Sequence, residues 1–176
     1  MSYEKVTSLI NNSNKIIILT GAGISVNAGI PDFRSSGGIF QKIKKEFGLS
    51  TPEELFDITS FKKDPSRFYI MFTNLWLNIK DALPTKTHKF IKSLEDKNKL
   101  LANYTQNIDD LERKSGVNKV LQCHGSIDNG ICLRCNANYK LDTLYNNQNN
   151  KFNFVCTINK LGKICGGIIK PNIEGV

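Results

Sequence analysis

The chain has 176 residues, enough for one domain with a core, and its hydrophobic fraction of 40% and charged fraction of 23% are ordinary for a globular protein. The longest aliphatic run, IIIL, is too short to cross a bilayer, so we expect no membrane partner. The first residues lack the basic and apolar regions of a secretory signal, so we expect the protein in the nucleus or the cytoplasm. The net charge of +8 comes from scattered lysines, so direct nucleic-acid binding is not indicated.

Three short apolar runs predict the strands of a parallel sheet. KIIILT (15–20), KLLANYT (99–105) and NKVLQC (118–123) have strand length, and their continuous apolar character predicts burial on both faces. Helical stretches separate them, which is the order of an α/β protein. The runs end at Gly21, at the segment QNID and at His124. Because ligands bind at the carboxyl ends of the strands in such sheets, these ends predict one site.

Three helices are predicted between these strands. The first lies in the segment 64–80, with Asp64 as N-cap and an apolar stripe that we assign to the core. The second spans 87–97 and carries His88 on its apolar face, which favours a structural role for His88 over a catalytic one. The third, DDLERKSG, ends at Gly116.

The loop GAGISVNAGIPDFR follows the first strand and has features of a phosphate-binding loop. Gly21 and Gly23 allow the backbone to approach a pyrophosphate, and Ser25 offers a hydroxyl donor. The third glycine of the oxidoreductase fingerprint is replaced by Val26, and no clear acidic ribose reader follows. The loop therefore indicates a nucleotide ligand but disfavours hydride transfer.

The other two strand ends carry polar candidates. Gln106 and Asn107 offer amides that suit ribose hydroxyls or a carboxamide, whereas Asp109 could equally cap the third helix. His124 ends a strand before Gly125, where the chain can turn sharply, and is a candidate general base.

Four of the five cysteines predict a structural zinc site. Cys132 and Cys135 form a CxxC, and Cys156 and Cys165 follow in a polar module. Four thiolates suit tetrahedral Zn²⁺, and a redox CxxC, the alternative, usually lacks a second cysteine pair nearby. The eight residues between the second pair are many for a zinc knuckle. We interpret Cys123 as a small buried apolar residue.

Together these motifs resemble the sirtuins, a family of NAD-dependent protein lysine deacylases. The resemblance runs from about Lys15 to Ile173 and is carried by GAGISVNAGIPDFRSS, YTQNIDDLERKSG, LQCHGS and the cysteines that lead into CGGIIKP. LERKSG and LQCHGS look most like the eukaryotic deacetylase branch. The desuccinylase branch reads acidic acyl chains with a Tyr and Arg pair, for which we find no convincing counterpart, although Arg67 and Tyr69 lie in that region.

The resemblance implies that the protein consumes NAD, deacetylates lysine in proteins such as histones, and releases nicotinamide and O-acetyl-ADP-ribose. It implies that the cofactor-binding residues are Gly21, Ala22, Gly23, Ser25, Asp32, Phe33, Arg34, Gln106, Asn107, Ile108 and Asp109. Phe33 would shield the reacting ribose from water, and Asp109 would bind the carboxamide. His124 and Asn107 would be catalytic, with His124 as the base that activates a ribose hydroxyl. One structural Zn²⁺ would lie remote from this site.

The resemblance also implies a domain organisation. Residues 1–127 would be the N-terminal half of a Rossmann-like parallel sheet with helices, 128–170 a small inserted zinc-binding module, and 171–176 the start of the second half. A sirtuin continues beyond this point, with the first strand at the centre of its sheet. We therefore expect a truncated deacetylase that by itself binds NAD weakly and has little activity. The alternative is a non-catalytic, zinc-stapled binding module.

Overall fold

The computed structural model describes residues 2–32, 35–49, 51–146, 148–149 and 151–174. The α-helices are α1 Tyr3–Asn12, α2 Ile39–Phe47, α3 Ile58–Lys63, α4 Ser66–Ile79, α5 Lys86–Asp96 and α6 Leu111–Lys114. The 3₁₀ helices are η1 Ala22–Ile24, η2 Val26–Ala28, η3 Pro52–Phe56 and η4 Leu141–Leu144. The strands are β1 Ile16–Thr20, β2 Leu100–Thr105, β3 Val120–Gln122, β4 Gly125–Cys132, β5 Asn138–Lys140, β6 Tyr145–Asn146, β7 Lys151–Phe152, β8 Asn159–Lys160, β9 Lys163–Ile164 and β10 Ile169–Ile173. Across these ranges, every helix is too short or too polar to cross a membrane.

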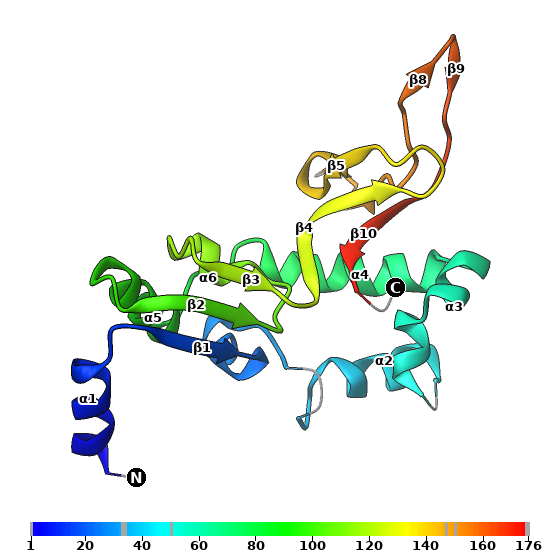
Figure 1. The fold of residues 1–176 in the computed structure, drawn as a ribbon. Coiled ribbons are helices and arrows are strands. Elements are labelled where there is room, and N and C mark those ends of the chain that lie inside the picture. Colours follow the sequence, from blue (N-terminus) through cyan, green and yellow to red (C-terminus); the bar gives the residue numbers. More distant parts are fainter. Residues whose placement is uncertain (1, 33–34, 50, 147, 150, 175–176) are drawn as a thin grey trace.

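Strands β1, β2 and β3 form a parallel sheet in that order (Figure 1). The predicted α/β class and the predicted parallel strands are confirmed. Thr20, Thr105 and Gln122 are paired at the carboxyl ends, so the loops that follow the three strands begin side by side. In the described part of the chain β1 pairs only with β2 and lies at an edge of the sheet.

The prediction that these strands are buried on both faces is wrong for the described structure. One face packs against α5 in a small core made of Ile91, Leu94, Leu100, Val117 and Val120. On the other face Ile17 is 60% exposed and Leu19 is 67% exposed. Successive strand residues point to opposite faces, and none of the described elements covers this second face.

The helices lie close to their predicted positions. The buried stripe of α4, with Phe68 and Phe72, belongs to the larger core, as predicted. The helix begins at Ser66 with Pro65 at the N-cap, so the prediction of Asp64 as N-cap is wrong, although the Asp64 carboxylate accepts the Ser66 N–H at 3.0 Å. α6 is a single short turn that ends before Gly116, where a positive φ of 91° suits glycine.

The four-cysteine module rises away from the sheet, with the β8–β9 hairpin farthest from it (Figure 1). Its central strands β10, β4 and β5 are antiparallel. The module contacts α4 through Tyr69, whose ring stacks on Phe154 with centroids 3.9 Å apart and whose hydroxyl donates to the Ile169 carbonyl at 3.1 Å. The domain limits proposed from the sequence fall inside β4 and β10, and the division stays a prediction.

Candidate functional site

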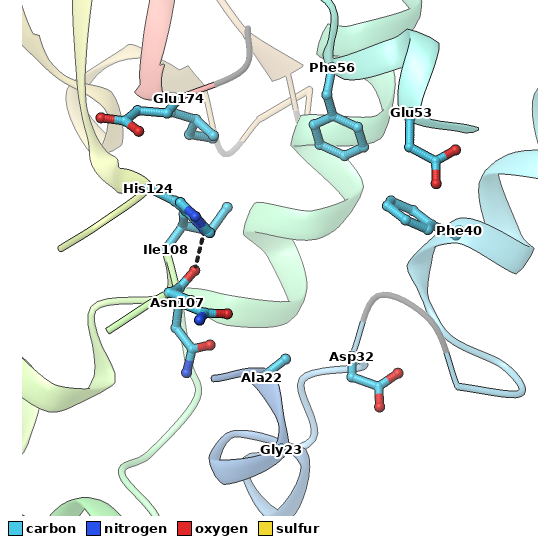
Figure 2. Close-up of a pocket in the computed structure, with 12 residues that line it drawn as sticks. Ala22, Gly23, Asp32, Phe40, Glu53, Phe56, Asn107, Ile108, His124 and Glu174 are labelled. Carbon is cyan, nitrogen blue, oxygen red and sulfur yellow. Dashed lines mark hydrogen bonds between the residues drawn. The ribbon is translucent and has the colours of Figure 1, made fainter. Parts of the chain in front are cut away.

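The ends of the three parallel strands border a cleft of about 520 Å³ (Figure 2). Its described lining consists of Ala22, Gly23, Asp32, Phe40, Glu53, Phe56, Gln106, Asn107, Ile108, His124, Ile173 and Glu174. The structure thus brings together candidate residues from the glycine loop, from the QNID segment and from the end of β3. The prediction of one cleft at this edge of the sheet agrees with this geometry.

The glycine loop leaves its backbone open to the cleft. A Cβ atom at Gly23 would meet no protein atom within 4 Å, and one at Gly21 would meet only Gln106 Oε1, at 4.0 Å. The described part of the protein therefore has room for a larger residue at both positions. Glycine at these positions would instead allow a ligand to approach the main chain closely, which fits a pyrophosphate group.

Asn107 connects the glycine loop to the QNID segment. Its side-chain amide donates to the Gly21 carbonyl at 3.1 Å, and its backbone N–H donates to Thr105 Oγ1 at 3.0 Å. The backbone N–H of Gln106 also donates to the Thr20 carbonyl, at 3.0 Å. These bonds fix the position of one loop against the other, so a ligand on the glycine loop also faces the Asn107 amide.

His124 lies exposed at the edge of the cleft (Figure 2). Its Nδ1 is 3.1 Å from the Gln106 carbonyl oxygen. Because a carbonyl only accepts, this contact places the proton on Nδ1 and leaves the Nε2 lone pair available. Gly125 has a φ of 79°, and a Cβ there would lie 2.0 Å from the Asn172 carbonyl oxygen, so glycine is required at the turn that presents His124.

Ser25 and Asp109 are buried beside the cleft. The Ser25 hydroxyl donates to Asp109 Oδ2 at 2.7 Å, and the Leu111 N–H donates to Asp109 Oδ1 at 2.9 Å. Asp109 therefore does help to cap α6, which was the alternative interpretation of this residue. Burial raises the pKa of Asp109, and this effect outweighs the two hydrogen bonds, which lower it. Because the Ser25 proton is engaged within the protein, direct phosphate binding by Ser25 stays a prediction.

Asp109 also lines a second, smaller cavity of about 20 Å³. This cavity and the cleft share the lining residues Ala22, Asn107 and Ile108. The rest of its wall includes Ser25, Ile30 and Pro31. Its wall offers the Asp109 carboxylate among largely apolar residues, but a cavity of this volume has room for about one water molecule. The expected contact of Asp109 with the carboxamide therefore stays a prediction.

The segment PDFR is only partly described. The Asp32 carboxylate accepts the Ser35 N–H at 2.9 Å and the Ser35 hydroxyl at 2.5 Å, so Asp32 shapes the loop at the border of the cleft. Phe33 and Arg34 lie outside the described residues, and their expected roles stay predictions.

Five lining residues were not found from the sequence: Phe40, Glu53, Phe56, Ile173 and Glu174. Phe40 and Phe56 belong to α2 and η3, and their rings lie 6.2 Å apart between centroids. No motif marks these segments, because an aromatic residue that lines a cleft has the same sequence pattern as one in a core.

Arg67 and Tyr69 do not line the cleft. Arg67 borders a separate depression with Leu49 and Glu54, and Tyr69 packs on Phe154 in the contact with the module. The interpretation that the chain has no desuccinylase-type pair stays a prediction.

The four cysteines of the module are suited to a structural zinc ion. The sulfur atoms of Cys132, Cys135, Cys156 and Cys165 all lie within 4.8 Å of one another. Two of the separations are 3.7 Å and 3.6 Å. Thiolates 2.3 Å from a tetrahedral zinc ion are about 3.8 Å apart, so the cluster fits this ion.

The long spacing of the second cysteine pair has a structural explanation. The β8–β9 hairpin occupies the intervening residues and returns the chain, so that the Gly166 N–H donates to the Cys156 carbonyl at 3.0 Å. Gly167 follows, and a Cβ there would lie 2.7 Å from Cys132 Sγ. Cys123 is only half-buried at the end of β3, so its interpretation as a buried core residue was wrong.

Fold and site together define an α/β protein with a nucleotide-type glycine loop, a histidine at the same sheet edge and a four-cysteine module. The model of the Sir2 family matches residues 21–174, and the chain belongs to this family.

Two curated relatives illustrate the similarity. The chain is 46% identical over 144 residues to the NAD-dependent histone deacetylase sirtuin-1 of Drosophila melanogaster, covering 81% of this chain and 17% of that protein. It is 39% identical over 175 residues to the NAD-dependent protein deacetylase sir-2.1 of Caenorhabditis elegans, covering 98% of this chain and 27% of that protein. The chain spans between 17% and 34% of the length of such relatives.

Solved structures agree with the fold. A structure of Sir2 with a p53 peptide and NAD⁺ superposes with a TM-score of 0.77 at 31% identity, covering 98% of this chain and 64% of that chain. A structure described as the structural basis of sirtuin substrate affinity gives a TM-score of 0.78 at 32% identity, with 98% and 65% covered.

Proposed function

We propose that this chain carries the catalytic part of an NAD-dependent protein lysine deacetylase. The observation that carries the proposal is His124, whose Nδ1 lies against the Gln106 carbonyl while its Nε2 remains an acceptor at the cleft. The same cleft is lined by the open glycine loop and by Asn107. A base, a nucleotide loop and a polar amide in one cleft are what a reaction on a ribose requires.

When bound, NAD would supply the ribose carbon that the acetyl-lysine oxygen attacks, the nicotinamide that leaves from it, and the ribose hydroxyl that receives the acetyl group. The residues of the chain then have distinct tasks. The backbone at Gly21 and Gly23 holds the phosphates, Asn107 and Gln106 contact the ribose, and Asp109 accepts from the carboxamide. His124 removes a proton from a ribose hydroxyl at Nε2, and the Gln106 carbonyl keeps the ring in the required tautomer.

The proposed substrates are acetylated lysine side chains of proteins such as histones. The Drosophila relative is named as a histone deacetylase, and one similar structure contains a p53 peptide. The cleft offers Phe40, Phe56 and Ile173 as apolar surface for a neutral acyl chain, which supports acetyl over acidic acyl groups. A nuclear or cytoplasmic location follows from the same substrates. Phe33 and Arg34 are proposed to complete the wall around the reacting ribose.

The test measures nicotinamide release and peptide deacetylation with NAD and an acetyl-lysine peptide, and NAD binding by calorimetry, for the chain and its His124→Ala variant. We expect weak NAD binding by both, and peptide deacetylation, at whatever low rate the chain supports, only with His124. Deacetylation that is unchanged in His124→Ala would exclude this base. A folded, zinc-containing chain that binds the peptide but neither binds NAD nor deacetylates would instead support the non-catalytic binding module.

A further inference from the structure

Tyr139 connects the two cysteine pairs of the module. It belongs to β5, which begins shortly after Cys135 and pairs with β4 through Gly130. The Tyr139 hydroxyl donates to Cys156 Sγ, with oxygen and sulfur 2.9 Å apart. A residue that follows the first cysteine pair in the chain thus contacts a sulfur atom of the second pair.

The direction of the Tyr139 proton follows from a second hydrogen bond. The backbone N–H of Thr157 donates to the Tyr139 hydroxyl oxygen at 3.2 Å. A phenol oxygen can accept one hydrogen bond while it donates its own proton in another. A thiolate that ligates a metal has lost its proton, so the hydroxyl would also be the donor to Cys156 when the site is filled.

Both partners of this bond are held in place by the fold. The Tyr139 ring is partly buried and packs against the larger core. The Cys132 N–H donates to the Ala137 carbonyl at 2.9 Å, which fixes the turn that leads into β5. Cys156 is 0% exposed, and its N–H donates to the Gly167 carbonyl at 2.8 Å. Because the fold already orders these groups, little further conformational entropy is lost when the hydroxyl and the sulfur meet.

The contact with Tyr139 differs in kind from the backbone contact at Cys132. Cys132 Sγ accepts the Arg134 backbone N–H at 3.4 Å. Among the residues that the structure describes, Tyr139 is the one side chain outside the cluster that donates to a cluster sulfur. A backbone donor is present with any residue type except proline, whereas a hydroxyl donor at this position depends on tyrosine.

A donor at this sulfur suits a filled metal site. Four thiolates around one divalent cation leave a net negative charge, which is spread over the sulfur atoms. Hydrogen bonds to an ionised acceptor are stronger than those to a neutral one. Cys156 is fully buried, so water cannot supply this donor in the place of Tyr139.

We propose that Tyr139 is a positioning residue of the metal site, which orients Cys156 Sγ towards the ion and stabilises the charge on this ligand through its hydroxyl proton. Partners of this kind orient the ligands of a metal and tune its properties. Tyr139 acts through Cys156 and is not itself a ligand. The proposal concerns the module alone, so it stands whether or not the cleft binds NAD.

A purely structural role of Tyr139 gives a different expectation. The bond from the Thr157 N–H would brace the loop after Cys156 even if the contact with sulfur had no effect on the metal. Loss of the hydroxyl would then lower the stability of the module and leave the electronic state of the sulfur unchanged. The test therefore needs a spectroscopic readout in addition to stability.

Tyr139→Phe in the cobalt-substituted chain supplies this readout. The variant keeps the packed ring and removes only the hydroxyl, and amide spectra of the metal-loaded protein check that it folds. A thiolate without the hydrogen bond gives up electron density more readily, so we expect the sulfur-to-cobalt charge-transfer absorption to move to lower energy. An unchanged absorption spectrum would overturn the proposal, as would a chain that takes up no cobalt.

Competition with a chromophoric chelator measures the zinc affinity of the unmodified chain and of Tyr139→Phe. Loss of such a partner typically lowers metal affinity about 10- to 100-fold, and we expect a loss of this size. A variant that is less stable but has the same zinc affinity and the same cobalt spectrum would show that Tyr139 only braces the loop, and the proposal would be overturned.

Tyr69→Phe is the matched control. It removes a hydroxyl that donates to the Ile169 carbonyl of β10 at 3.1 Å, so the chemical change is the same but the lost partner is a carbonyl oxygen and not a sulfur. We expect the cobalt spectrum of this variant to match that of the unmodified chain. If Tyr69→Phe shifted the spectrum as Tyr139→Phe does, the shift would reflect a general loosening of the module, and the assignment of Tyr139 to Cys156 would be wrong.

Discussion

The cleft at the sheet edge and the four-cysteine module differ in what holds them together. The cleft joins Gly21, Asn107 and His124, which are far apart in the sequence, through strand pairing and hydrogen bonds. The module has several strands of only two residues around four thiols. The comparison teaches that the geometry of the cleft is a property of the sheet and its core, whereas the module is built around a four-cysteine cluster suited to a structural zinc ion.

The two regions are nevertheless connected. β4 begins directly after His124 and continues to Cys132, the first cysteine of the cluster. The Glu174 N–H, just after β10, donates to the His124 carbonyl at 3.1 Å. The rings of Tyr69 and Phe154 form a second connection, between α4 and the module. The predictions below separate what is local to each region from what passes between them.

Removal of zinc should have the largest effect. Chelation, or Cys165→Ser, should unfold the module, because structural zinc contributes roughly 10 to 16 kcal/mol of apparent binding free energy in small zinc-binding peptides. The parallel sheet should remain, since its core contains none of the four cysteines. Metal analysis and hydrogen exchange of β2 and β4 measure both effects.

Cys123→Ser is the control for this experiment, because Cys123 lies outside the cluster. It should retain one zinc ion per chain. A purified chain without zinc, or a Cys165→Ser variant with unchanged zinc, would contradict the assignment of the four ligands.

His124→Ala should abolish whatever deacetylation the chain supports and leave the fold and zinc content intact. Loss of a general base typically costs on the order of a hundred- to ten-thousand-fold in rate, and the exposed ring of His124 contributes little packing. His88→Ala should instead lower the free energy of unfolding by roughly 1 to 3 kcal/mol, because it removes a buried ring that caps α5. Deacetylation of an acetyl-lysine peptide, nicotinamide release and thermal melts of both variants distinguish the roles, and the reverse pattern would show that the base is misassigned.

The sequence predicted the cleft residues that stand in recognisable loops after apolar runs. Gly23, Asn107 and His124 were found in this way, because the carboxyl ends of parallel strands meet at one edge. Phe40 and Phe56 were missed, since their contribution arises from how α2 and η3 fold back over the cleft. Long-range placement of this kind has no local signal.

The burial of the strands could not be predicted from the same runs. The continuous apolar character of 15–20 indicates two apolar faces, but which faces are covered depends on the elements that pack against them. Likewise the spacing of Cys156 and Cys165 is compatible with a zinc site only because a hairpin, invisible as a motif, closes the gap. Residue types were thus better predicted than their surroundings.

A smaller effect concerns pH and Asp110, which lies just before α6. Burial, together with a hydrogen bond to Asp128 of β4, raises the pKa of Asp110 to about 7. The folded state then binds a proton more tightly than the unfolded state, so the free energy of unfolding should fall as pH rises from about 4 to about 7. Asp110→Asn should remove this part of the pH dependence.

Urea unfolding of the chain and of Asp110→Asn at several pH values measures this difference, and subtraction of the two curves removes the contributions of the other groups. Asp128→Asn should give an intermediate slope, because it removes the hydrogen-bonded partner but not the burial. Identical slopes in the chain and in Asp110→Asn would show that Asp110 does not retain its proton in the folded state.

The smallest effect should come from the contact that joins α4 to the module. Tyr69→Phe removes the hydrogen bond to the Ile169 carbonyl and keeps the ring that stacks on Phe154, so it should cost about 0.5 to 1.5 kcal/mol of stability. Tyr69→Leu removes the stacking as well and should cost more. With zinc bound, the loss should appear as faster hydrogen exchange in β10 and not in β2, because the contact lies on the module side of the molecule. Equal acceleration in both strands would mean that the two regions unfold as one unit, and the contrast between a sheet-held cleft and a metal-held module would have to be given up.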